Sequence, residues 1–261
     1  IQPQPAISPQ LDGVNVNVSV STIAGDLLIR SNQDVRLNAA VSSVAGDIGV
    51  IAVRDVIAAN AVITAGNGLL AAGRNVSMSA TSSVNANGSL LVNSGGDQTI
   101  AVLNAANVGL NSGASILDAN AAALNITATN LNMVAVGSIG ASDLTNFQSA
   151  NDNAIDIRVA SVAAQSANGM YLRQVAAGGA LTIGHVDAVN VSVNVNQVNF
   201  NSSTTILSQS RSLAELDDLT TTADGPIKVV VAGGTLSSFS NTTVRVLTGC
   251  GCCCCCLRPM D

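Results

Sequence analysis

Valine alternates with asparagine or serine in two stretches of the chain. Residues 14–21 read VNVNVSVS, and residues 189–196 read VNVSVNVN. Because successive side chains of a β-strand point to opposite faces, this period of two predicts strands with every valine on one face. Elsewhere the apolar runs are short and are interrupted by Asn, Ser or Gly, which favours short strands over helices.

A turn followed by thin apolar strands recurs every twenty-odd residues. The phrase AGDLLIRSNQDVRLNAA begins at Ala24, AGDIGVIAVRDVIAANA at Ala45, and AGNGLLAAGRNVSMSA at Ala65. We expect glycine in each phrase to supply a positive-φ turn between strands. The candidate turn glycines are Gly25, Gly46, Gly66 and Gly88, at spacings of 21, 20 and 22, then Gly113 and Gly137 at spacings of 25 and 24.

This repeat length predicts one particular all-β architecture. About 21 residues hold roughly three short strands and their corners, which is too little for a propeller blade of about 40 residues. It suits one coil of a parallel β-helix (a β-solenoid), where coils about 4.8 Å apart stack small Ala, Val and Asn side chains. A β-sandwich is the competing architecture, but it usually needs aromatic core residues, and this chain has no Trp and one Tyr.

We therefore predict an all-β protein, a parallel right-handed β-helix with about 20–25 residues per coil and about eleven coils. Its expected divisions are a Pro-rich N-terminal segment with the first strand (residues 1–20), the solenoid repeats (residues 21–249) and a Cys-rich tail (residues 250–261).

Composition narrows the possible partners. Hydrophobic residues make up 48% of the chain, aromatic residues 2% and charged residues 10%, so Val, Ile, Leu and Ala must fill the interior while Asn, Ser, Thr and Gly cover it. A net charge of −6 and scattered arginines argue against a nucleic-acid partner. No apolar run reaches the roughly 18 residues of a membrane span.

Three longer phrases carry a family resemblance. They are SGASILDANAAALNITATNLNMVAVGSIGASD from Ser112, NGMYLRQVAAGGALTIGHVDAV from Asn168, and DDLTTTADGPIKVVVAGGTL from Asp217. Over roughly residues 20–240 the chain resembles the giant bacterial β-strand-repeat surface proteins, whose β-helix repeats are similar to filamentous haemagglutinin. The resemblance implies secretion to the bacterial cell surface, a right-handed β-helix, and a stalk, adhesin or fibre without catalytic residues. The short chain and its cysteine-rich end depart from that pattern.

All six cysteines lie in the final phrase CGCCCCCLRPMD. Disulfides that link one protomer to the next are one interpretation, and a thiolate site for a soft metal is another. Adjacent cysteines cannot all face one centre from a strand, and zinc ligands are usually spaced C-x₂₋₄-C, so no metal or cofactor is assigned. A low-complexity terminus without a role is the third. The candidate cross-link residues are Cys250, Cys252, Cys253, Cys254, Cys255 and Cys256.

Few other residues suggest chemistry. His185 is the single histidine, and we expect it to be exposed. The acidic residues of LAELDDLTTTADG, Glu215, Asp217, Asp218 and Asp224, lack a glycine-rich calcium pattern and are expected in a solvated loop. Ser212 and Glu215 form an S-x-x-E capping box, which predicts one helical turn there.

The ends of a solenoid are expected to be its working parts, because each leaves unpaired strand edges. No amphipathic capping helix is evident in the sequence. A head-to-tail contact between copies does not close on itself, so it would build a filament. The candidate contact residues are Val14, Val16, Val18 and Val20 at one end and Val244 and Val246 at the other.

Three classes of function are compatible with such a rod. A polysaccharide-acting enzyme would need grouped carboxylates and aromatic sugar platforms, whereas here the acidic residues are spread along the chain. An ice-binding surface would need threonines repeating at the coil period, and they do not. We therefore expect a non-enzymatic, extracellular structural or adhesive solenoid, without cofactor, that contacts copies of itself or neighbouring repeats of a larger surface protein.

Overall fold

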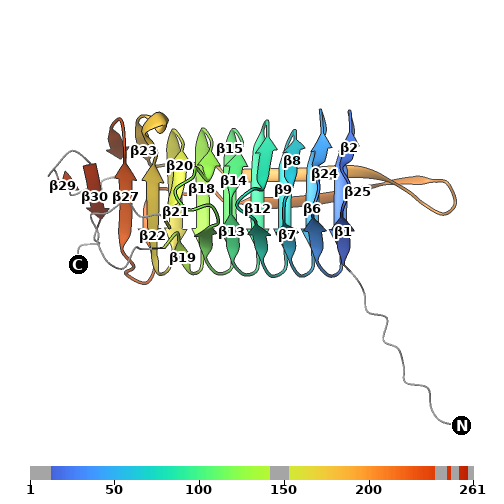
Figure 1. Ribbon diagram of the computed structural model, residues 1–261, viewed down its shortest axis with the longest axis horizontal. Coiled ribbons are helices and arrows are strands. Elements are labelled where there is room, and N and C mark those ends of the chain that lie inside the picture. The colour runs from blue at the N-terminus through green and yellow to red at the C-terminus, as the bar shows by residue number, and fades with distance from the viewer. Residues whose placement is uncertain (1–12, 142–152, 239–245, 248–252, 258–261) are drawn as a thin grey trace, which may run out of the picture.

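The computed structural model describes residues 13–141, 153–238, 246–247 and 253–257. It confirms an all-β fold: parallel strands stack as a β-solenoid of about 8 coils, and the one helical element among these residues is the short 3₁₀ helix η1 (Ala176–Gly178). In Figure 1 the coils line up along one axis, with β1 at one end and β27 and β30 near the other.

Each regular coil contributes one strand to each of three parallel ladders. The first ladder holds β1 (Val14–Val16), β4 (Val35–Leu37), β7 (Val56–Ala58), β10 (Val76–Met78), β13 (Gln98–Ile100), β16 (Ile116–Asp118), β19 (Ser138–Ile139), β22 (Gly169–Gln174) and β27 (Ile227–Val231). The second holds β2 (Val20–Thr22), β5 (Val41–Ser43), β8 (Val62–Ala65), β11 (Ser83–Ala86), β14 (Val102–Asn104), β17 (Ile126–Thr127) and β20 (Ile155–Arg158). The third holds β3 (Leu27–Ser31), β6 (Ile48–Ala52), β9 (Gly68–Ala72), β12 (Ser89–Ser94), β15 (Asn107–Ser112), β18 (Asn130–Ala135), β21 (Ser161–Ser166), β23 (Leu181–Ile183) and β28 (Leu236–Ser238), with β26 (Leu219–Thr221) also pairing with β21.

The repeat is regular at first and then lengthens. Val14 pairs with Val35, and side-chain hydrogen bonds between neighbouring early coils join positions 20 or 21 apart in the chain. Later partners in the same ladder lie much farther apart: Ile139 pairs with Met170, and Met170 pairs with Ile227. The predicted number of coils is therefore too high, because the later coils contain long insertions.

Aliphatic side chains fill the interior of the coils, as composition predicts. Val35, Val56 and Val76 stack in register along the first ladder, and all three are buried. Each fully buried side chain of this size contributes about 1.5–3 kcal/mol of hydrophobic stabilisation. The core is therefore a continuous column along the axis.

The two alternating valine stretches behave differently. In residues 189–196, Val189, Val191 and Val193 are buried and their asparagine and serine neighbours are exposed, which confirms the prediction. In residues 14–21, Val18 is 74% exposed, so the single-face prediction is wrong there. The chain turns a corner between β1 and β2, and Val18 lies on that corner.

The corner glycines form two columns instead of one. Gly25, Gly46, Gly66 and Gly88 stack at the corner before the third ladder, whereas Gly113 lies above Gly95 at the corner after it. Gly113 and Gly137 therefore do not continue the first series. Nor do these glycines have left-handed φ angles. A Cβ at Gly46 would lie 2.3 Å from the carbonyl oxygen of Gly25, so the close stacking of coils requires glycine.

A long antiparallel hairpin interrupts the solenoid. Its strands are β24 (Val189–Val198) and β25 (Thr204–Leu213), and it lies lengthwise along the third ladder and projects beyond the β1 end (Figure 1). Ser212 belongs to β25, and Glu215 lies outside any helix, so the predicted helical turn is wrong. The strand pairing of β25 with β24 takes precedence over the capping-box pattern.

At the C-terminal end, β30 (Cys253–Leu257) pairs antiparallel with β27, and β29 (Val246–Leu247) pairs antiparallel with β30. The order β27–β30–β29 reverses direction twice. The outermost strand β29 consequently runs in the same direction as β27 and the rest of the first ladder.

Candidate functional site: the two ends of the rod and the hairpin

Polar side chains link successive coils at the corner before the third ladder. The carboxylate of Asp26 accepts the backbone N–H of Asp47 at 2.9 Å, and Asp47 accepts the backbone N–H of Asn67 at 2.7 Å. Asn67 in turn accepts the N–H of Ser89 at 2.8 Å. These bonds satisfy corner N–H groups that the strand ladders leave free, so the stacking continues around the corner.

The corner after the third ladder has a similar column. Asp55 accepts the backbone N–H of Asn75 at 3.0 Å, Asn75 accepts that of Asp97 at 2.9 Å, and Asp97 accepts that of Ser115 at 2.8 Å. The column gives each coil one further axial bond. Both corners therefore stiffen the rod along its length.

Arginines accompany the second column. Arg74 forms a hydrogen-bonded ion pair with Asp55, and Arg54 lies 3.4 Å from the carboxylate of Asp34. Burial alone would raise the pKa of Asp55. The hydrogen bond from Arg74, the N–H of Asn75 and the charges of both arginines outweigh burial and lower this pKa below its ordinary value of 3.8. Asp55 is therefore held ionised within the column.

A buried ion pair lies farther along the rod. Asp156 of β20 has a fully buried side chain, and Arg173 of the neighbouring strand β22 forms a two-pronged pair with it, one prong from Nη2 to Oδ2 at 2.6 Å. Arg173 also donates to the carbonyl of Ala122 at 3.0 Å. Asn125 accepts the backbone N–H of Asp156 at 2.8 Å. These bonds tie an irregular coil to its neighbours, which is a structural use of the charges.

The N-terminal end presents three strand edges. In the described residues β1, β2 and β3 pair with the second coil alone. The N–H of Val14 and the carbonyl of Val16 bond to the second coil, so the alternation of a parallel ladder turns the N–H and carbonyl of Asn15 to the outside. The same argument places Ser21 on the open edge of β2, because Val20 and Thr22 face inward along the ladder.

Glycines in the third ladder leave room for side chains of the hairpin. A Cβ at Gly49 would lie 3.4 Å from Val193 of the hairpin, and one at Gly109 would lie 3.0 Å from Val189. The four residue-to-residue steps from Val189 to Val193 span about 14 Å, as do the three strand spacings from β15 to β6. The hairpin valines thus match the coil spacing. They join a second apolar cluster with Leu69 and others, outside the solenoid core.

Two polar contacts secure the ends of this docked part. The carboxylate of Asp26 in the first coil accepts the backbone N–H of Asn194 at 3.0 Å, and the side-chain amide of Asn132 in β18 donates to the carbonyl of Ala214 at 2.7 Å. The hairpin is therefore packed and hydrogen-bonded from β18 to the first coil. Its remaining residues lie farther toward the N-terminal end (Figure 1).

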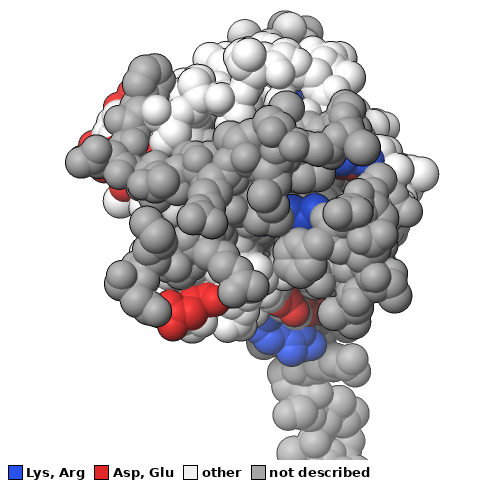
Figure 2. Space-filling model, turned by 90° about the vertical axis from the view of Figure 1, so that its left-hand side faces the viewer, with Lys and Arg blue, Asp and Glu red and all other residues white. Residues whose placement is uncertain are grey.

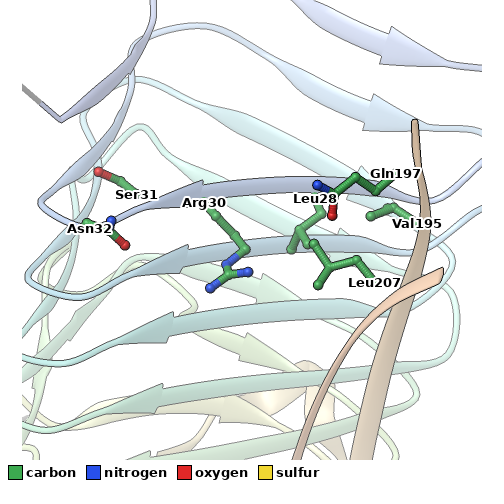
Figure 3. A pocket seen from close by; sticks show the side chains of 7 residues that line it. All are labelled: Leu28, Arg30, Ser31, Asn32, Val195, Gln197 and Leu207. Atoms are coloured by element: carbon green, nitrogen blue, oxygen red, sulfur yellow. The ribbon is translucent and has the colours of Figure 1, made fainter. Parts of the chain in front are cut away.

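A groove lies where the hairpin crosses β3 (Figure 3). Leu28, Val195 and Leu207 gather at one end of it, and Arg30 extends from β3 along its floor. The groove is open and has a volume of about 590 Å³, with Ser31, Asn32 and Gln197 also lining it. Beyond this groove the hairpin projects past the first coil (Figure 1). We call residues 198–206 the overhang.

The single histidine lies at the base of the hairpin. Nδ1 of His185 is 2.8 Å from Asp217, and Nε2 is 3.2 Å from Asp187. The hydrogen bond with Asp217 first, then that with Asp187 and the charges of both, raise the pKa of His185 above 6.5. The side chain is 52% exposed, as predicted for this residue. Among the described residues no group of His, Cys, Asp and Glu could hold a metal ion.

The predicted site residues fall partly within the described ranges. Val14, Val16 and Val20 lie in the edge strands β1 and β2, and Val246 lies in the outermost strand β29. Val244 lies outside the described residues, as do Cys250 and Cys252, while Cys253, Cys254, Cys255 and Cys256 belong to β30. The end contact and the cross-link both stay predictions.

Figure 2 views the molecule from the β27 and β30 end, and the described residues in view carry small patches of Lys or Arg and of Asp or Glu. No helix in the described part has the length and apolar character to cross a membrane.

Comparison with protein-family models, with curated proteins and with solved structures finds no match for this chain. The solenoid agrees with the fold that the β-strand-repeat resemblance implies. Membership of that group of surface proteins stays a prediction.

Sequence patterns alone did not reveal the hairpin. Two signals were present: the alternating stretch at residues 189–196 is followed by a short Asn- and Ser-rich segment at residues 199–203, and glycines occur inside strands at Gly49 and Gly109. An interior strand glycine often marks the close approach of another segment. Here that segment is the hairpin.

Proposed function

We propose that this protein is an extracellular structural or adhesive rod that assembles head to tail into a filament or a stalk. The single observation that carries the proposal is the pair of strand edges at its ends. Among the described residues, β1 is the last strand of the first ladder at the N-terminal end, and β29 is the last at the C-terminal end. Both run in the same direction, so β1 of one copy can continue the first ladder beyond β29 of another.

Two further features support a structural role. The corner columns of Asp, Asn and Ser add axial hydrogen bonds to those of the strands, as a stiff spacer requires. Ionisable groups of the coils serve the stacking itself, as Asp55 and Asp156 illustrate. Placement at the bacterial surface rests on the family resemblance. In a longer surface protein the same edges would meet neighbouring repeats.

Proline at the open edge tests the assembly. We expect the wild type to form rods in electron micrographs and to sediment as polymers at high protein concentration. The double variant Asn15→Pro, Ser21→Pro removes two N–H groups that face outward, and we expect it to raise the concentration needed for assembly at least about tenfold. Circular dichroism should show the same strand content as the wild type.

The matched control is Asn15→Ala, Ser21→Ala, which keeps both N–H groups and should assemble like the wild type. A proline at Val16 would be a poor test, because Val16 bonds to the second coil. A wild type that remains a monodisperse monomer at every concentration contradicts the proposal. So does a proline variant that assembles normally.

A further inference from the structure

The hairpin strand β25 has an outer edge that pairs with no other strand in the described part. Asn199 donates its N–H to the carbonyl of Ser203 across the tip at 2.8 Å, and Asn194 donates its N–H outward to Asp26. Because antiparallel partners exchange hydrogen bonds at every second pair, the odd-numbered residues bond within the hairpin. The even-numbered residues of β25 therefore turn their N–H and C=O groups to the outer edge: Thr204, Ile206, Ser208, Ser210 and Ser212.

Side chains of β25 cap part of this edge. Gln209 donates to the carbonyl of Ser208 at 2.7 Å, and Arg211 donates to that of Ser210 at 2.8 Å. Among the described residues, the backbone groups of Thr204 and Ile206 at the edge have no hydrogen-bond partner. Proline and inward-pointing charge, which usually protect an exposed edge, are absent from residues 204–208. We call residues 204–208, which begin in the overhang, the open edge.

The groove that Arg30 lines is on the same side of the hairpin as the open edge. The N–H of Asn194 reaches Asp26, which precedes β3, so the edge of β24 faces the start of β3. The open edge of β25 consequently faces the other end of β3, where Arg30 lies along the floor of the groove beside Leu207 (Figure 3). A strand that pairs with the open edge lies in this groove.

Such a strand meets different chemistry on its two faces. On the solenoid side is Arg30, which is exposed and forms no ion pair among the described residues. On the outward side is Ile206, which is 71% exposed. Because successive side chains of a strand point to opposite faces, a ligand that alternates carboxylates with aliphatic side chains fits both. Its carboxylates would form charge-assisted bonds with the guanidinium of Arg30.

We propose that the open edge binds an extended acidic peptide of another protein as a third strand of the hairpin. The peptide backbone bonds to Thr204 and Ile206, its carboxylates face Arg30, and its aliphatic side chains contact Ile206. The strands at the two ends of the rod and in the hairpin carry no acidic residue, so a second copy does not supply these carboxylates. The contact needs one copy only and does not rest on head-to-tail assembly.

Calorimetric titration of the full chain with short peptides tests the site. The probe is acetyl-SVEVEVS-amide. The charge control is acetyl-SVKVKVS-amide, and the pattern control acetyl-SVVVEES-amide has the composition of the probe without its alternation. We expect the probe to bind at least about tenfold more tightly than either control, with an affinity that falls as the salt concentration rises.

Amide hydrogen exchange followed by NMR locates the bound probe. The N–H groups of Thr204, Ile206 and Ser208 face outward, so their exchange should slow when the probe is added. Those of Thr205 and Leu207 already bond to β24 and should change little. This alternation distinguishes strand addition from contact with the hairpin surface.

Two pairs of variants separate the backbone from the charge. Ile206→Pro removes an N–H from the open edge and no bond within the hairpin, so it should weaken probe binding at least about tenfold relative to Ile206→Ala. Arg30→Gln should weaken binding about three- to tenfold. Its matched control is Arg36→Gln, which alters an exposed arginine of β4 in the first ladder and should bind like the wild type. Circular dichroism should show unchanged strand content in all four.

Several results would overturn the proposal. These are no saturable binding of the probe up to about 1 mM, equal binding of the three peptides, and equal affinity of Ile206→Pro and Ile206→Ala. Protection confined to β1, β2 and β3 would place the probe at the end of the rod instead. Loss of self-association in Ile206→Pro, with no peptide bound, would assign the edge to a second copy. A wild type that stays monomeric yet binds the probe contradicts the filament and supports this site.

Discussion

The N-terminal and C-terminal halves of the rod achieve the same stacking by different means. In the N-terminal half, paired residues of neighbouring coils stay close to the 21-position spacing of Asn17 and Asn38, and glycine and Asp or Asn columns repeat at the corners. In the C-terminal half the paired strands are separated by long insertions, and one coil is tied by the buried pair of Asp156 and Arg173. Regular coils are stabilised by many small repeated contacts, whereas irregular coils depend on a few specific ones.

The largest expected effect comes from breaking the buried pair. Arg173→Gln leaves the buried carboxylate of Asp156 without its arginine, which should lower the free energy of unfolding by about 3–5 kcal/mol. The same substitution in the N-terminal half, Arg54→Gln, removes a pair that is 46% exposed on the arginine side and should cost about 0–1 kcal/mol. Urea denaturation of both variants measures the difference. Equal losses would refute the contrast between the halves.

Corner glycines give the next largest effect. Gly46→Ala brings a Cβ to 2.3 Å from the carbonyl oxygen of Gly25, and we expect a loss of about 1–3 kcal/mol in the free energy of unfolding. Gly25→Ala, in the same column, meets only the side-chain oxygen of Thr22 at 3.5 Å and should fold with unchanged or slightly greater stability. Thermal denaturation compares them. If both variants lost stability alike, the stacking explanation of the glycines would be wrong.

The smallest effect concerns protonation at the hairpin base. His185 is the single histidine, so its NMR titration can be read without assignment ambiguity, and its pKa should lie above 6.5. Asp217→Asn removes the largest cause and should bring the pKa back toward 6.5, with a smaller change for Asp187→Asn. Because the folded pKa is raised, the stabilisation is complete below pH 6.5 and is lost as pH rises through the folded value. A titration at or below 6.5 would contradict this.

In the N-terminal half the corresponding pH effect has the opposite sign. The pKa of Asp55 is lowered, so its contribution to stability is present above pH 3.8 and disappears as pH falls through the lower folded value. The contribution of Asp55 should therefore be lost at acidic pH, whereas that of His185 should be lost as the pH rises through its folded pKa.

The regular half was predictable from the sequence. Stacked coils place equivalent residues on top of one another, so the constraint on each coil repeats and appears as a period in the chain, as Gly46 and Asp47 illustrate. The reason for the glycines was wrong even so. We expected positive φ at these corners, but the requirement is the distance to the coil below.

The hairpin could be predicted only in part. The alternation in residues 189–196 predicts a strand with valine on one face, and that is correct. Nothing local specifies which surface those valines cover, because Gly49 and Gly109 are distant in the chain and belong to the repeat. The return of residues 253–257 to pair with β27 is equally non-local.

The hairpin contact between Asn194 and Asp26 joins residues 168 positions apart, whereas neighbouring strands of the early coils are about 21 apart. Ribosomal synthesis delivers the N-terminal coils long before the segment that clamps them, and closing the longer loop costs more chain entropy. Leu69, Ala71 and Leu91 are buried together with the hairpin valines in the folded protein, so they are solvent-accessible until the hairpin docks. During synthesis, the apolar surface of the third ladder that the hairpin covers is therefore exposed until the last third of the chain has emerged.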